Sequence, residues 1–132
     1  MRIVLDTNVL LSGILTPHGA PGSVVNAVLD NRFTVLLDDC ILLEYRDVLK
    51  RPRFAFPSHY VQALLEFFEH HGEHVIAGPR AFGVADPADL PFYEVAIAGA
   101  ADYLVTGNDK HFPQEPLVVS PKAFVDLLRS RE

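Results

Sequence analysis

The sequence predicts an α/β protein in which helices pack on a mostly parallel sheet, and two observations support this. Short runs of apolar and β-branched residues alternate with segments in which apolar residues recur every three or four positions. Polar residues follow the apolar runs directly, as where Asp6 follows Ile3–Leu5. Such alternation is typical of a layered fold with a parallel sheet.

Five apolar runs predict the strands. Each is short and is bounded by polar residues, glycine or proline. The predicted strands are residues 2–6, 33–37, 74–77, 102–106 and 117–119.

Five segments with helical spacing of apolar residues predict the helices. Pro52 ends the second, and Pro121 begins the last. Ser58 is expected to be the N-cap of the third and Gly72 its C-cap. The predicted helices are residues 22–30, 41–50, 58–71, 89–100 and 121–129.

Length and charge limit the class of protein. With 132 residues, 49% of them hydrophobic, the chain is expected to form one domain over residues 1–132. Its net charge is −6, from 17 acidic and 11 basic residues. This argues against a protein that holds nucleic acid by overall positive charge. It is compatible with an enzyme whose acidic site is neutralised by a metal ion before the substrate arrives.

Cysteine content and hydropathy predict where in the cell the protein is found. Cys40 is the only cysteine, which excludes an internal disulfide and favours a reducing cytoplasm. Because two carboxylates precede it, we expect Cys40 to be a packing residue rather than a nucleophile. The nearly uncharged stretch 95–101 is too short to span a membrane, and the apolar run after Arg2 is too short for a signal peptide. A cytoplasmic protein without membrane association is therefore expected.

Acidic and amide side chains follow two of the predicted strands. Asp6 ends the first, and Asn108 and Asp109 follow the strand 102–106. In α/β proteins the carboxyl ends of parallel strands border the ligand crevice, and such oxygens suit a hard divalent cation. The alternative is that Asp6 and Asp109 only cap the helix or turn that follows.

Two further segments add acidic groups. Asp86 and Asp89 flank the start of the helix 89–100, where Asp86 could be a simple N-cap and Asp89 a first-turn acid. Glu44 lies in the middle of the helix 41–50, either as a solvated charge or as a site residue.

Taken in order, these segments resemble the PIN-domain nucleases. The likeness rests on the opening strand with Asp6 and Asn8, on Glu44 in an amphipathic helix, and on residues 86–92 and 101–108. Their order and spacing match across nearly the whole chain. The closest likeness is to the VapC-like toxins of bacterial and archaeal type II toxin–antitoxin pairs.

The resemblance implies a single PIN-like domain with a three-layer α/β/α fold, whose central, mostly parallel sheet has about five strands. It also implies a metal-dependent endoribonuclease that cleaves single-stranded RNA and binds Mg²⁺ or Mn²⁺ through clustered acids. As partner it implies a small antitoxin protein that blocks the acidic crevice.

Three acids carry over directly from the family pattern. Asp6 matches the first family acid, Glu44 the second and Asp89 the third. A divalent ion held by Asp6, Asp89 and a fourth oxygen would activate water and stabilise charge on the phosphoryl oxygens. Glu44 is then a candidate proton acceptor.

Two residues could fill the fourth acidic position of the family pattern. Many PIN domains have Thr-x-Asp there, and counting from Thr106 places Asn108 at that position, with Asp109 one residue later. Either Asn108 serves as a neutral oxygen ligand, or Asp109 supplies the catalytic carboxylate and metal ligand.

Polar residues beside the acids are candidates for supporting hydrogen bonds. Thr7, Asn8 and Thr106 are expected to orient the carboxylates, although strand-end polar residues often satisfy only the backbone.

Basic residues after Glu44 are candidates for RNA contact. Arg46 and Lys50 share a helix face within a basic cluster that also holds Arg51 and Arg53, and Lys110 follows the last acidic motif. The alternatives are an ordinary solvated face and a surface loop whose Phe112 packs into the core.

Two other functions are compatible with parts of the pattern. A phosphatase of the haloacid-dehalogenase type needs a second Asp where this chain has Asn8. A PIN-like scaffold that binds RNA or a partner without cutting is compatible with the neutral Asn108. A homodimer could form through apolar residues of the helix 58–71 (Val61, Leu65, and Phe67 or Phe68), which could equally form a wide core face.

Overall fold

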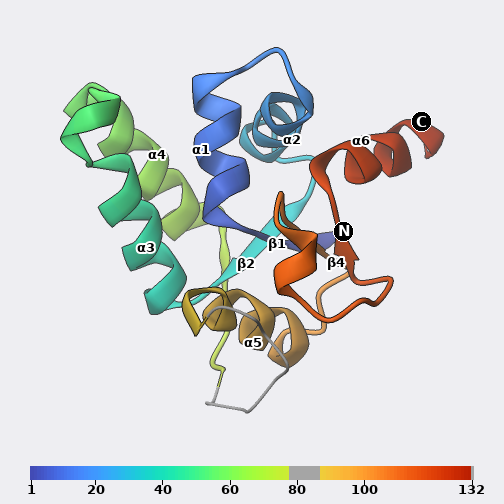
Figure 1. Cartoon of the computed structure of the whole chain (residues 1–132). Coiled ribbons are helices and arrows are strands. Elements are labelled where there is room, and N and C mark those ends of the chain that lie inside the picture. The colour runs from blue at the N-terminus through green and yellow to red at the C-terminus, as the bar shows by residue number, and fades with distance from the viewer. Residues whose placement is uncertain (78–86, 132) are drawn as a thin grey trace.

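The computed structural model describes residues 1–77 and 87–131, and within them five strands form a parallel sheet (Figure 1). Its order is β3-β2-β1-β4-β5, and every neighbouring pair is parallel, which confirms the predicted sheet. The strands are β1 (Arg2–Leu5), β2 (Thr34–Leu37), β3 (Glu73–His74), β4 (Tyr103–Val105) and β5 (Val118–Val119).

Helices cover both faces of the sheet, so the fold has the expected three layers. Figure 1 shows α5 on one side and α1 and α2 on the other. None of the described helices is long and apolar enough to cross a membrane. The α-helices in the described residues are α1 (Thr7–Leu15), α2 (Ala20–Leu29), α3 (Asp39–Leu49), α4 (Ser58–His71), α5 (Leu90–Ala98) and α6 (Pro121–Ser130). The 3₁₀ helices there are η1 (Pro52–Phe54), η2 (Pro87–Asp89) and η3 (Asp109–His111).

Helix α1 was not among the predicted helices. It begins directly after β1 and is apolar over most of its length, so its sequence lacks the polar face that marks an amphipathic helix. Gly13 lets it approach α2 closely, because a Cβ there would lie 2.5 Å from Cγ2 of Val25 and 2.7 Å from the Pro21 carbonyl oxygen.

The boundaries of α4 differ in part from those predicted. Ser58 is the first helical residue, Pro57 takes the N-cap position, and no side chain caps the helix there. Gly72 is the C-cap as predicted, in an extended conformation. Glycine is needed for space, since a Cβ would meet the Phe68 carbonyl and lie 2.8 Å from Cδ2 of Leu37. The next strand, β3, begins one residue earlier than predicted and is shorter.

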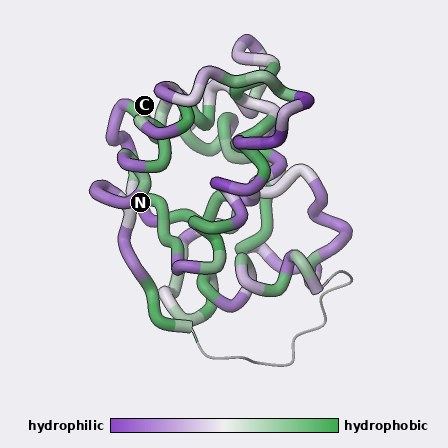
Figure 2. Tube along the Cα trace, turned by 90° about the vertical axis from the view of Figure 1, so that its left-hand side faces the viewer, coloured by the Kyte–Doolittle hydropathy of each residue, from purple (hydrophilic) through white to green (hydrophobic). Residues whose placement is uncertain are grey.

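The core lies between the sheet and the helices. Along the Cα trace, hydrophobic segments run through the middle of the molecule and hydrophilic ones lie mostly on its outside (Figure 2). On α4, Val61, Leu65 and Phe68 are buried and Phe67 packs partly against the core, so these residues form a core face rather than an exposed dimer face. The expectation that Cys40 is a packing residue is wrong, because it is exposed near the start of α3.

Candidate functional site

Asp6 stands where β1 passes into α1. Its backbone N–H extends the sheet by donating to the Val105 carbonyl at 3.0 Å, and its own carbonyl accepts the N–H of Val9 at 3.0 Å. Although Asp6 occupies the N-cap position, its side chain makes no capping hydrogen bond. The carboxylate instead accepts a hydrogen bond from the hydroxyl of Thr106, 2.7 Å from Oδ2. The simple capping role considered for Asp6 is therefore wrong.

The Asp6 carboxyl is buried, with 4% of the residue exposed. The pKa of this carboxyl is raised to about 6, chiefly by burial and also by the nearby carboxylates of Asp89 and Glu44. The hydrogen bonds from Thr106 and from the Thr7 backbone act in the opposite direction but do not cancel this effect. A buried carboxylate next to two others is an unfavourable charge that a bound cation would stabilise.

Tyr45 fixes Glu44 beside the end of β1. The Tyr45 ring is fully buried, and its hydroxyl donates to the carbonyl of Leu5, the residue before Asp6, at 2.5 Å. Burial raises the Tyr45 pKa well above its ordinary value, so this hydroxyl stays a donor. The neighbouring Glu44 accepts a hydrogen bond from the hydroxyl of Thr7 and is half-buried, unlike a charge on a solvated face.

Asp89 enters the site from the start of α5. It occupies the N-cap position there without a side-chain capping bond. Its side chain is 14% exposed, and Oδ2 lies 3.1 Å from Nδ1 of His111 on η3. Asp86, considered as an N-cap, lies outside the described residues.

The loop after β4 completes the site. Thr106 is fully buried, and its hydroxyl oxygen accepts the N–H of Asn108 at 3.0 Å while the hydroxyl donates to Asp6. The side-chain oxygen of Asn8 accepts the N–H of Gly107 at 3.2 Å, which ties α1 to this loop. Of the predicted supporting residues, Thr106 contacts Asp6, Thr7 contacts Glu44, and Asn8 contacts only the loop.

The acids from separate segments face one crevice of about 240 Å³. Asn108 lines it, whereas Asp109 lines a different hollow together with Lys110 and Glu115. The residues lining the crevice are Asp6, Thr7, Asn8, Leu11, Glu44, Val48, Arg51, Asp89 and Asn108.

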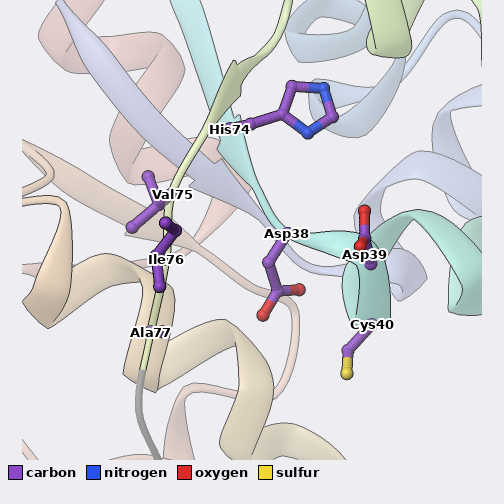
Figure 3. Close-up of a pocket in the computed structure, with 7 residues that line it drawn as sticks. All are labelled: Asp38, Asp39, Cys40, His74, Val75, Ile76 and Ala77. Atoms are coloured by element: carbon purple, nitrogen blue, oxygen red, sulfur yellow. The ribbon is translucent and has the colours of Figure 1, made fainter.

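A larger hollow of about 390 Å³ lies elsewhere, at the edge of the sheet (Figure 3). It is lined by Asp38–Cys40 at the start of α3 and by His74–Ala77, and shares no residue with the acidic crevice. The Asp38 carboxylate caps α3 by accepting the N–H of Ile41 at 2.9 Å. None of the predicted site residues lines this larger hollow.

The donor set of the acidic crevice suits a hard cation. Asp6, Glu44, Asp89 and Asn108 offer the carboxylate and amide oxygens that Mg²⁺ and Mn²⁺ prefer, without the thiolate or imidazole ligands that are usual in zinc sites. Within the described residues no three Asp, Glu, His or Cys side chains form a ready-made metal cage. Mg²⁺ does not require one, because it keeps several of its waters and is often bound through one or two carboxylates.

The predicted RNA-contact residues do not line the crevice. Arg46, Lys50 and Lys110 are exposed but are not among its lining residues, whereas Arg51 is. Arg51 was predicted only as a member of the basic cluster, although it follows Glu44 and Val48 at helical spacing. Two further contacts were not predicted from the sequence: the hydrogen bond from Tyr45 to the Leu5 carbonyl, and the contact of His111 with Asp89.

Comparison with known families supports the resemblance. The sequence model of a family described as PIN domain matches residues 2–110. The matched range includes Asp6, Glu44, Asp89 and Asn108. A comparison with curated proteins found no match.

Proposed function

The chain belongs to the PIN-domain family and has a nuclease-type fold, and we propose that it is an endoribonuclease that hydrolyses phosphodiester bonds of single-stranded RNA with Mg²⁺ or Mn²⁺. The observation that carries this proposal is the convergence of Asp6, Glu44 and Asp89 on one crevice at the carboxyl end of a parallel sheet. Such an oxygen-rich crevice is suited to metal-assisted hydrolysis.

In this proposal Asp6, Asp89 and Asn108 would hold the cation. When bound, the ion supplies a Lewis acid for the phosphoryl oxygens and lowers the pKa of water. Asn108 is preferred over Asp109 as the fourth ligand because only Asn108 lines the crevice. A neutral amide reduces the charge of the site and hence its affinity for the metal.

Glu44 would accept the proton of the attacking water. Its carboxylate is held by the Thr7 hydroxyl, and Tyr45 anchors the helix that carries it. A proton acceptor must be held within hydrogen-bonding reach of its partner, which this arrangement favours. Thr106 would orient Asp6, and Asn8 would hold the loop that carries Asn108.

The biological setting is proposed from the resemblance. The protein would act in the cytoplasm as the toxin of a type II toxin–antitoxin pair, and its antitoxin would block the crevice. Arg46, Lys50 and Lys110 would guide RNA from outside the crevice, since they are exposed cations.

A second candidate is a PIN-like scaffold that binds RNA without cutting it. The neutral Asn108 at the crevice favours it, because a site with less negative charge holds a catalytic metal less tightly. The phosphatase alternative is disfavoured, because Asn8 stands where that chemistry needs a second acid and its side-chain oxygen is bonded to Gly107.

Cleavage of structured and unstructured RNAs tests the proposal. Wild type, Asp6→Asn and Asp39→Asn are incubated with each RNA and with Mn²⁺, Mg²⁺ or EDTA. Asp39 is a matched control, because it is an exposed carboxylate outside the crevice. Metal-dependent cutting by wild type and Asp39→Asn but not by folded Asp6→Asn supports the nuclease. RNA binding without cutting by wild type would support the scaffold instead.

A further inference from the structure

One basic side chain reaches the acidic crevice. Among the described residues that line it, only Arg51 is basic. Glu44 and Val48 lie on one face of α3, and Arg51 continues that face just beyond the helix end, which Lys50 caps. A single cation is thus held at the rim of a hollow that otherwise carries only negative and neutral groups.

The Arg51 guanidinium has no acceptor within residues 1–77 and 87–131. The ion pairs there join Arg2 to Glu73 and His111 to Asp89. Arg51 is exposed and pairs with none of the carboxylates that line the same crevice. Its five N–H donors are therefore available to a ligand.

The backbone that carries this side chain is fixed. The N–H of Arg51 donates to the Val48 carbonyl at 3.2 Å, and its carbonyl accepts the N–H of Phe54 at 3.1 Å. Pro52 follows and favours the extended conformation that Arg51 adopts. The turn ends at Ala55, whose φ is 51° and whose N–H donates to the Pro52 carbonyl at 3.1 Å. Because the backbone is already ordered, less entropy is lost when the side chain binds a ligand.

We propose that Arg51 binds a phosphate of the RNA strand at the crevice, an inference that rests on the proposed ribonuclease function. The planar guanidinium matches the oxygens of a phosphate with two parallel hydrogen bonds. Its charge also offsets the repulsion between RNA phosphates and the crevice carboxylates. Because phosphates are common to all nucleotides, Arg51 contributes affinity and register rather than sequence preference.

The first test is RNA binding by Arg51→Ala, Arg51→Lys and Arg53→Ala. Arg53 is the matched control, since it lies in the same turn and its guanidinium sits 4.8 Å from the centre of the Phe54 ring. Binding of a short fluorescein-labelled single-stranded RNA is followed by anisotropy in Ca²⁺. Arg51→Ala should weaken binding about tenfold, as expected for one charge-assisted contact. It should also lower the slope of log affinity against log salt by about 0.7.

The controls separate a phosphate contact from a folding defect. Arg51→Lys should keep the salt slope and recover part of the affinity, because it restores the charge but not the planar fork. Arg53→Ala should bind RNA within about twofold of wild type. Thermal melting of Arg51→Ala should match that of wild type, because the Arg51 side chain makes no ion pair or hydrogen bond within the described residues. Its Mn²⁺ affinity should not fall, because removal of a positive charge beside the crevice does not weaken cation binding.

A neutral link in the RNA backbone tests directly whether Arg51 contacts a phosphate. A series of RNAs is made, each with one methylphosphonate at a different position, and the affinity of each RNA is measured for wild type and for Arg51→Ala. Wild type should lose affinity at the contacted position, and Arg51→Ala should show no further loss there. Equal losses in both proteins at every position, or wild-type affinity in Arg51→Ala, would overturn the inference while the nuclease proposal stands. If wild type neither binds nor cuts RNA, both proposals fall.

Discussion

At the scale of single residues, the site depends on how Asp6 is surrounded. The residue is buried, accepts a hydrogen bond from Thr106 and lies near two more carboxylates. Its negative charge therefore opposes folding in the absence of metal, and the same charge is what attracts a cation.

Stability at different pH values tests this environment. The Asp6 pKa is about 6 in the folded chain, against an ordinary value of 3.8. Between pH 4 and 6 the folded chain keeps a proton that the unfolded chain has released, so the free energy of unfolding falls as pH rises through this window. The loss is complete about one unit above the folded pKa, near pH 7, at about 3 kcal/mol.

Asp6→Asn removes this titration. In EDTA it should be more stable than wild type at pH 7, by up to about 3 kcal/mol, and the difference should vanish near pH 4. Urea unfolding at both pH values measures this, with Asp39→Asn expected to follow wild type. An Asp6→Asn variant that is less stable than wild type at pH 7 would contradict the burial of the charged carboxyl.

A second prediction at this scale concerns the fourth metal ligand. Asn108→Asp adds a carboxylate to the crevice and should raise Mn²⁺ affinity by about tenfold, because ligand charge sets the affinity of such sites. Asp109→Asn should leave the affinity within about twofold, since Asp109 lines another hollow. Calorimetric titration with Mn²⁺ measures the affinity of both variants. A loss of affinity in Asp109→Asn with no gain in Asn108→Asp would assign the ligand to Asp109.

At the scale of elements, α3 is the part whose placement matters most. Glu44 reaches the crevice because the buried Tyr45 hydroxyl ties this helix to the end of β1. The helix and its apolar face were predicted from spacing, as was the strand before it. The hydrogen bond between α3 and β1 was not predicted, because spacing within one helix does not indicate which carbonyl a tyrosine hydroxyl will contact.

Tyr45→Phe tests the link between α3 and β1. The ring keeps its packing on Phe68, 5.1 Å between centroids, but the Leu5 carbonyl loses its donor. The variant should lose about 1–3 kcal/mol of stability in urea unfolding. It should also cut RNA roughly tenfold more slowly, because Glu44 is less well held.

Tyr93→Phe is its matched control. The Tyr93 hydroxyl donates to Glu115 at 2.9 Å, and neither residue lines the crevice. This variant should cut RNA at the wild-type rate at a temperature where both proteins are folded. Equal slowing in the two variants would mean that Tyr45 acts only through stability.

At the scale of the whole molecule, the crevice is assembled from segments far apart in sequence. The parallel sheet brings Asp6 beside Thr106, and both strand ends were predicted from their apolar runs. Helix α1 was not predicted because it is apolar over most of its length, and the choice between Asn108 and Asp109 could not be made from spacing. That choice depends on the path of the loop after Thr106, which the bonds of Thr106 and Asn8 determine.

Addition of metal back to one EDTA-treated sample tests the central claim most directly. Single-stranded RNA is incubated with stripped wild type, and its cleavage is followed before and after Mn²⁺ is supplied, with Asp6→Asn in parallel. We predict no cleavage before addition, cleavage by wild type afterwards, and none by Asp6→Asn. Cleavage by stripped wild type, or equal cleavage by folded Asp6→Asn after addition, would contradict a metal-dependent nuclease site at this crevice.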